Sequence, residues 1–350
     1  MLKLAILLVL LPAMAWSQEQ YSSLAAGIRS LPSSRVYFTG QLHNSGANAV
    51  IEKTFLFTLN RDHGVRNVII EYGHSAAFLL NLYLKSGNDS VLKYIHPQAG
   101  FDFIRSVKQF NDTVPAARKV TFYGIDFEGR EDGRHLKKAL EYILRLTDIP
   151  NRHELYVMIA GIIQAPSASM EKAIKKLRSY MYRQVNESRK YLGAYYLDAL
   201  LMCHAQYGFV PRRDDEMYDN FKRLYKELVA RGEHPAFYAS FGMGHINPSN
   251  SQGIANRLLN SSDSPVMNKV SITGVHYFNC AFGTESNKRT SEGILDFLCK
   301  SIPATDKTEA CMYFIPPAAL TGSKCEDAIN RLSGLVIVAN FGPSGYWMWE

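Results

Sequence analysis

The chain has 350 residues, is 47% hydrophobic and 12% aromatic, and carries a formal net charge of +7 at pH 7. This length is sufficient for one large domain, or two small ones, with a sizeable core. The hydrophobic fraction excludes an intrinsically disordered chain. The positive charge is dispersed, without a long Lys/Arg run, so no nucleic-acid partner is expected.

The first residues are typical of a secretory signal peptide. Lys3 supplies the positive charge, residues 4–11 form the apolar segment, and small residues precede a cleavage site after Ser17. The alternative is a buried N-terminal helix. The apolar run is too short for a permanent membrane span, and no second run reaches that length. We therefore expect residues 18–350 to form an exported protein, periplasmic or secreted.

Export permits disulfide bonds, and the chain has five cysteines. Cys203 lies in a helical pattern and is expected to be a buried thiol. The other four crowd the last quarter of the chain and allow three pairings that the sequence does not separate. They are Cys280, Cys299, Cys311 and Cys325. We expect one or two disulfides there, and no Cys-x-x-Cys cluster indicates structural zinc.

Short apolar runs recur along the chain and end in turns. They cover residues 36–39, 68–70, 120–123, 237–241, 270–278, 312–315 and 335–339. Near-continuous Val, Ile and Phe are typical of parallel strands that are buried on both faces.

Helical patterns separate the first of these runs, at residues 47–60, 74–84 and 134–146. From about residue 151 to 231 the strand patterns stop and amphipathic helices follow one another. Alternating strands and helices indicate βαβ units. The sequence therefore predicts one α/β domain with a mainly parallel central sheet flanked by helices, and a helical insertion at about 151–231.

Polar residues follow several predicted strands where each strand ends. They are Gln41 and His43, Glu71, Asp126 and His245. Each alone has an ordinary explanation as a turn or capping residue. Together they point to one crevice, because active sites of open α/β sheets lie outside the carboxyl ends of the strands.

Four blocks resemble the erythromycin esterase-like family, which is related more distantly to haem-binding iron-uptake proteins. Gly40-Gln41-Leu42-His43 is similar to the family's Gly-Glu-x-(x)-His, followed by Glu52-Lys53 on the next helix. Val68-Ile69-Ile70-Glu71 and Tyr123-Gly124-Ile125-Asp126 are similar to strands that end in an acid. The segment from Arg213 to Asn220 fits the family's R-D-x-x-M-x-x-N. The likeness covers about residues 35–250, and beyond about residue 265 it is generic α/β.

The sequence departs from the family pattern at two points. Gln41 replaces the family's acid, and its spacing to His43 is one residue shorter than in the esterases, closer to the haem-binding relatives. Gly242 replaces the first histidine of the family's His-Asn-x-His run, which leaves His245.

The resemblance implies metal-independent hydrolysis of an ester or lactone in a small-molecule substrate, without a cofactor. The catalytic residues would be His43, which takes a proton from water, Glu71, which orients it, and Arg213 and His245, which stabilise the oxyanion. Asp126 and Asp214 would hold these cations. The substrate-binding set is Gln41, Glu52, Lys53, Asp126, Asp214 and Asn220.

The sequence also bears on other functional classes. No Gly-x-Ser-x-Gly nucleophile elbow occurs, which disfavours a serine hydrolase. The main alternative is a non-catalytic or metal-dependent relative, in which His43, Glu71, Asp126 and His245 hold a divalent metal or a histidine ligates haem iron. For residues 213–220, the alternative is a helix capped by Asp214. The sequence predicts neither the substrate nor the oligomeric state.

Overall fold

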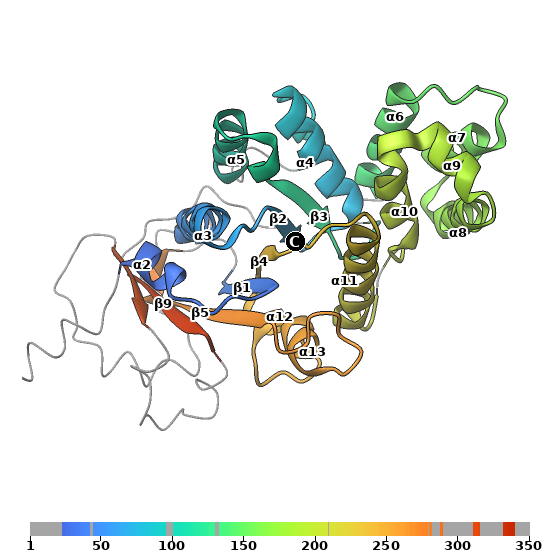
Figure 1. Ribbon diagram of the computed structural model, residues 1–350. Helices are drawn as coiled ribbons and strands as arrows, with labels where there is room; N and C mark the ends of the chain where they lie inside the picture. Colours follow the sequence, from blue (N-terminus) through green and yellow to red (C-terminus); the bar gives the residue numbers. More distant parts are fainter. Residues whose placement is uncertain are drawn as a thin grey trace, which may run out of the picture.

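The computed structural model describes residues 23–42, 45–95, 101–129, 133–208, 210–278, 280–281, 288–289, 311–315 and 332–339. Its centre is a seven-stranded sheet in the order β3-β2-β4-β1-β5-β9-β8 (Figure 1). These strands are β1 (Val36–Gln41), β2 (Asn67–Ile70), β3 (Thr121–Gly124), β4 (Phe237–Gly242), β5 (Val270–Phe278), β8 (Cys311–Ile315) and β9 (Gly334–Ala339). Every pairing is parallel except that of β8 with β9, so the predicted mainly parallel sheet is confirmed. A small antiparallel pair, β6 (Cys280–Ala281) and β7 (Lys288–Arg289), lies apart from it.

Helices connect the strands and cover both faces of the sheet (Figure 1). Before β3 they are α2 (Leu24–Arg29), α3 (Ala47–His63), α4 (His74–Ser86) and α5 (Phe101–Thr113). Between β3 and β4 they are α6 (Arg134–Leu146), α7 (Glu154–Gln164), α8 (Ser167–Arg183), α9 (Val185–Leu192), α10 (Tyr196–His204) and α11 (Arg213–Ala230). After β4 they are α12 (Met243–Ile246) and α13 (Ile254–Asn260). Single 3-10 turns occur at 92–94, 116–118 and 193–195.

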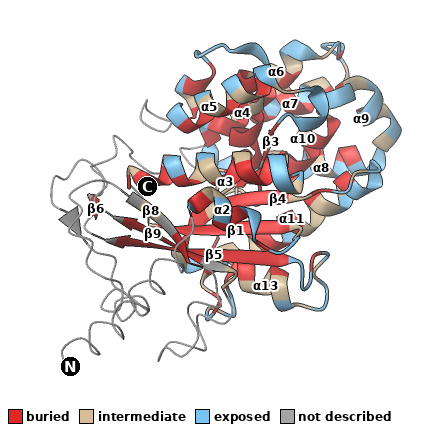
Figure 2. Ribbon diagram, turned by 60° about the vertical axis from the view of Figure 1, so that its left-hand side comes forward, coloured by how far each residue is buried: buried red, intermediate tan, exposed pale blue. Residues whose placement is uncertain are grey.

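The sheet is buried on both faces, as Figure 2 shows for its central strands. Tyr37 and Tyr238 point into a core that continues through α3 and α4 to the helices of the insertion. Phe38 and Phe241 point to the opposite side, into a second core formed with α11 and α13. Burying each such side chain contributes roughly 1.5–3 kcal/mol. Because side chains of a strand alternate between its faces, Phe38 and Phe241 pack against α11 on one face of the sheet. Helix α11 is the last helix of the segment that was predicted as an insertion.

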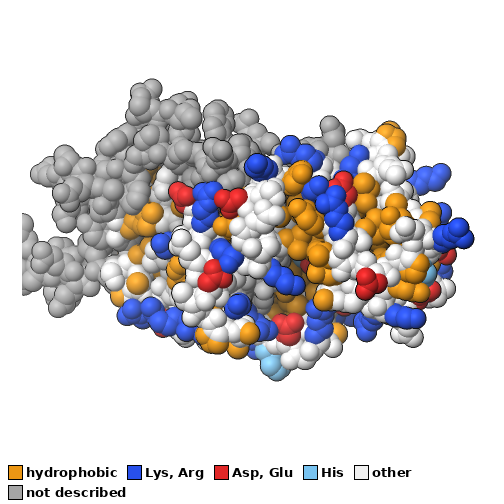
Figure 3. Space-filling view, turned by 90° about the horizontal axis from the view of Figure 1, so that it is seen from above, with side chains coloured by type: hydrophobic (Ala, Val, Ile, Leu, Met, Phe, Trp, Pro, Cys, Tyr) orange, Lys and Arg blue, Asp and Glu red, His pale blue; other side chains and the backbone are white. Residues whose placement is uncertain are grey.

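The surface of the described chain is mixed in charge. On the face seen in Figure 3, Lys and Arg side chains lie among acidic and hydrophobic ones. None of the helices in the described segments is both long and apolar enough to cross a membrane.

The structure tests only part of the cysteine predictions. Cys203 is a buried thiol, as predicted. The Cys280 thiol is also buried and donates to the Val338 carbonyl at 3.6 Å. Cys299 and Cys325 lie outside the described residues, as does the predicted signal peptide, and the side chain of Cys311 is not described. The disulfides remain a prediction.

Gly124 ends β3 in close contact with the loop after β2. A Cβ atom there would lie 2.3 Å from the Gly73 carbonyl oxygen and 2.5 Å from that of Tyr72. These are backbone atoms, which cannot rotate away.

We expect Gly124→Ala to lower the free energy of unfolding by about 2 kcal/mol or more through this strain. The matched control is Gly161→Ala in α7, where a Cβ meets nothing within 4 Å. It should stabilise by up to about 1 kcal/mol, because alanine favours a helix interior. Urea unfolding of both variants checks this, and equal effects would contradict the packing described.

Candidate functional site

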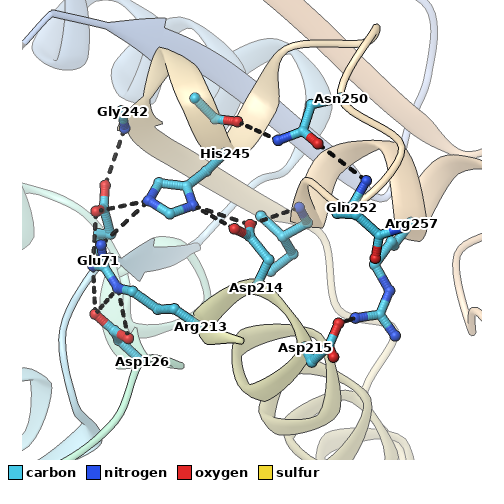
Figure 4. Close-up of polar contacts among 12 residues, drawn as sticks. Glu71, Asp126, Arg213, Asp214, Asp215, Gly242, His245, Asn250, Gln252 and Arg257 are labelled. Atoms are coloured by element: carbon cyan, nitrogen blue, oxygen red, sulfur yellow. Dashed lines mark hydrogen bonds and ion pairs between the residues drawn. The ribbon is translucent and has the colours of Figure 1, made fainter. Parts of the chain in front are cut away.

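Five polar residues meet where β2, β3 and β4 end (Figure 4). Glu71 directly follows β2, and Asp126 follows β3 by two residues. Arg213 and Asp214 form the start of α11, and His245 lies in α12 immediately after β4. Parallel strands bring their carboxyl ends to one edge, which explains why residues so distant in the sequence converge. We refer to these five residues as the Arg213 network.

Arg213 lies at the centre of this network. Its Nε donates to Asp126 Oδ1 and Oδ2 at 3.1 and 3.0 Å, and its Nη2 donates to Asp126 Oδ2 at 2.6 Å. The same Nη2 donates to Glu71 Oε1 at 2.8 Å. The Asp126 side chain is fully buried and that of Arg213 is 26% exposed. Since a buried carboxylate requires a paired cation, Arg213 makes the burial of both acids in the fold possible.

His245 lies between two carboxylates. Its Nδ1 is 3.0 Å from each oxygen of Asp214, and its Nε2 is 3.4 Å from Glu71 Oε1. The Nε2 is also 3.2 Å from Arg213 Nη1 and could accept from it if the ring were neutral. A protonated His245 ring is favoured, because the Arg213 network contains three carboxylates and only one guanidinium. Burial alone would lower the pKa of His245, but the hydrogen bonds and charges of Asp214 and Glu71 outweigh it and raise the pKa to about 9.

Glu71 is held as a carboxylate. Burial alone would raise its pKa, but the hydrogen bond and charge of His245, the charge of Arg213 and the backbone N–H of Gly242 lower the pKa to about 2. The Gly242 N–H donates to Glu71 Oε2 at 3.0 Å. At neutral pH, Glu71 is therefore a fixed negative charge and His245 a fixed positive one.

Bonds to the main chain hold the network in place. The Ile254 N–H at the start of α13 donates to Asp214 Oδ1 at 2.9 Å. Asn220 is buried on α11, and its Nδ2 donates at 2.9 Å to the Ile125 carbonyl, next to Asp126. Asn220, predicted to bind substrate, thus fastens α11 to the loop after β3.

The remaining predicted residues lie on the side of β1 and α3. Gln41 ends β1, is 5% exposed and is paired in register with Gly242. His43 lies outside the described residues. Glu52 on α3 bonds to Ser240 of β4, and burial raises its pKa to about 7. Lys53 is exposed on the same helix. Glu52 and Lys53 therefore lie outside the Arg213 network.

The sequence analysis missed an acid that supports this edge of the sheet. Glu128 is buried, accepts from the Ser75 N–H at 2.8 Å and from the Ser75 hydroxyl at 2.5 Å, and so caps the start of α4. The residue at the N-cap position is Gly73, which has no side chain to do this. The available signal was indirect, because Gly73 before α4 offers no side-chain cap and so implies a cap from elsewhere in the chain, without pointing to Glu128. His74 beside it binds Asp198 of α10 through Nε2 at 2.9 Å.

Among the described residues, no group of three or more His, Cys, Asp or Glu side chains is arranged to hold a metal ion. The Arg213 guanidinium lies between Glu71 and Asp126, and His245 lies between Glu71 and Asp214 (Figure 4). Each carboxylate of the network is therefore paired with Arg213 or His245.

The raised pKa of His245 predicts a specific pH dependence of stability. A group whose pKa rises from about 6.5 in the unfolded chain to about 9 in the fold stabilises fully below pH 6.5 and loses that contribution as pH rises through 9. We expect unfolding free energy to fall between pH 6 and 9.5 by on the order of 2–3 kcal/mol more in the wild type than in His245→Gln. Glu71 is ionised throughout this window and adds no slope. Denaturant unfolding at both pH values checks this, and parallel slopes would refute it.

Comparison with known proteins shows a shared fold. No family model and no curated protein matches the sequence. A protein from Bacillus cereus superposes with a TM-score of 0.65 at 12% identity, covering 95% of this chain and 98% of the other. A succinoglycan biosynthesis protein gives a TM-score of 0.63 at 14% identity, covering 93% and 96%. An erythromycin esterase mutant in its open conformation gives a TM-score of 0.60 at 11% identity, covering 93% and 94%. At these identities, the chain shares an overall fold with each of the three structures.

Proposed function

We propose that this protein is an exported hydrolase of the erythromycin esterase-like family, which cleaves an ester or lactone with an activated water molecule. The observation that carries the proposal is the Arg213 network, in which an arginine and a protonated histidine are fixed at the carboxyl edge of the sheet. Two adjacent cations suit a reaction that develops negative charge on a carbonyl oxygen. The fold shared with an erythromycin esterase supports the same reaction class.

The general base follows from the ionisation of the network. Glu71, with a pKa of about 2, is too weak a base to deprotonate water efficiently near neutral pH. His245, with a pKa of about 9, already carries its proton. His43 follows Gln41 by two residues in the sequence, and its ordinary pKa near neutrality suits the role. We assign it as the base.

In the proposed reaction, His43 removes a proton from water as the water oxygen attacks the carbonyl carbon. The tetrahedral oxyanion is stabilised by the positive charge of Arg213, whose Nη1 faces His245 instead of a carboxylate, and by His245 itself. When the intermediate collapses, the carbon–oxygen bond to the leaving group breaks, and protonated His43 gives its proton to the departing alkoxide. Glu71, Asp126 and Asp214 keep the two cations charged and in place.

The substrate side of the proposed site is formed by β1 and α3. We assign Gln41, Glu52 and Lys53 to substrate binding, because Gln41 ends β1, which pairs with β4, and Glu52 and Lys53 lie on α3, where Glu52 bonds to Ser240 of β4. Glu52, with a pKa of about 7, can donate a hydrogen bond as an acid or accept one as a carboxylate.

We expect His43→Ala to lower kcat/KM for a permissive ester by at least about 100-fold, the usual effect of losing a general base. The matched control is His234→Ala, which removes an exposed histidine and should retain activity within about twofold. Both variants should have the circular dichroism spectrum of the wild type. Unchanged turnover in His43→Ala would remove His43 from the mechanism.

Gln41→Glu tests the departure from the family pattern. A carboxylate beside His43 would raise the histidine pKa and help to orient water. We expect kcat/KM on the same ester to rise by about tenfold at high pH, which corresponds to roughly 1.4 kcal/mol of barrier. The acid limb of the pH–rate profile should move to higher pH, because His43 must lose its proton to act. A profile identical to that of the wild type would refute a direct interaction.

Elemental analysis and a visible spectrum of the purified protein test the reaction class. We expect hydrolysis of some ester or lactone in a broad panel, with rates unchanged by a chelator. A stoichiometric metal or a haem absorption band, with no turnover of any panel member, would replace the hydrolase by a binding protein.

The export part of the proposal rests on the N-terminal sequence pattern. Fractionation of expressing bacteria, followed by N-terminal sequencing, should give a chain that starts at Gln18 in the periplasm or medium.

A further inference from the structure

A cavity lies among the helices of the insertion. It has a volume of about 300 Å³ and is formed by α8, the end of α10 and one side of α11. In Figure 1, α8, α10 and α11 lie next to one another on the right-hand side of the view. The cavity has no lining residue in common with the Arg213 network, and Asn220 of α11 borders it. It is therefore a separate site.

Two arginines line this cavity without a carboxylate partner. Arg178 comes from α8 and Arg223 from α11. In the described segments neither forms an ion pair, and Arg223 donates to the amide oxygen of Asn220 at 3.1 Å. Two guanidiniums without an ion-pair partner therefore line the cavity, one from α8 and one from α11.

The carboxylates that line the same cavity are already engaged. Glu171 is paired with Lys175 at 2.6 Å. Glu216 accepts from the Gln206 N–H at 2.8 Å. Asp219 is paired with Lys222, which lies outside the lining, at 3.2 Å. Each of these carboxylates therefore has a bonding partner other than Arg178 and Arg223.

The pKa of His204 reflects both its burial and the charges of the two arginines. Burial lowers its pKa, and the charges of Arg223 and Arg178 lower it further, to about 3, so the ring is neutral at working pH. Its Nε2 contacts the Tyr182 hydroxyl, and its buried Nδ1 has no hydrogen-bond partner in the described part of the chain. When Tyr182 donates to Nε2, the neutral ring carries its proton on Nδ1, which is then a donor without an acceptor.

We propose that this cavity binds a small anion, with a phosphate or carboxylate group held between Arg178 and Arg223. Guanidinium groups match the planar oxygen pairs of these anions and are weakly hydrated, so they suit a partly enclosed site. The volume corresponds to about ten water molecules, which fits a compact metabolite-sized acid. The proposal does not depend on the hydrolase assignment.

The test is calorimetric titration of the purified full chain with inorganic phosphate, and separately with acetate, at constant ionic strength. We expect saturable binding of at least one of the two, and the comparison distinguishes the phosphate from the carboxylate. Arg178→Gln and Arg223→Gln should each weaken the affinity at least tenfold. Arg183→Gln removes the same charge from an exposed position of α8 and should change it less than twofold. No saturable binding of either anion, or equal affinities in all variants, would overturn the proposal.

A measurement on the wild type covers the case in which a variant does not fold. Phenylglyoxal modifies accessible arginines, and mass spectrometry gives the rate at each position. The bound anion should slow modification of Arg178 and Arg223 at least fivefold and leave Arg183 unchanged. Uniform slowing at all three arginines, or none, would show that the anion does not occupy the cavity.

Discussion

The site depends on one interaction, the burial of the Arg213 guanidinium between Asp126 and Glu71. Arg213 Nη2 donates to both acids, so without this cation two largely buried carboxylates would face each other without the guanidinium that pairs them. Arg213 belongs to α11, whereas its partners follow β3 and β2. The same ion pairs that set the charge of the site therefore connect the end of the helical segment to the sheet. Asn220 reinforces this connection from the same helix through the Ile125 carbonyl.

Much of the fold follows from the sequence, because parallel strands buried on both faces need continuous apolar runs. The runs at 36–39 and 237–241 became β1 and β4 with small extensions. The order of the sheet was not accessible in this way. The apolar run at 237–241 predicts a strand but not its place between β1 and β2, because the order of the strands depends on which helices cross each face of the sheet. Helices α5 and α13 were not singled out either.

The candidate site was partly predictable for the same reason. Glu71 and Asp126 are recognisable because acids close behind buried strands seldom belong to an apolar core, although Asp126 itself is fully buried against Arg213. Their shared partner Arg213 was not accessible, because it requires the position of α11, a helix far along the chain. Glu128 was missed because its role, to cap α4 from another loop, has no local sequence pattern. Asn220 fits a family motif, yet its bonds go to the main chain and to neighbouring side chains.

The ionisation states of the network limit the chemistry that it can perform. A carboxylate with a pKa of about 2 and an imidazolium with a pKa of about 9 keep the same charges across the physiological range. Groups of this kind can orient and stabilise a charged transition state without exchanging protons with it. Proton transfer then requires a separate group that titrates between these limits. Under the proposed function that group is His43, which follows Gln41 by two residues in the sequence. The charge pair itself is maintained from both sides, because His245 and Arg213 keep Glu71 ionised, and Asp214 and Glu71 keep His245 protonated.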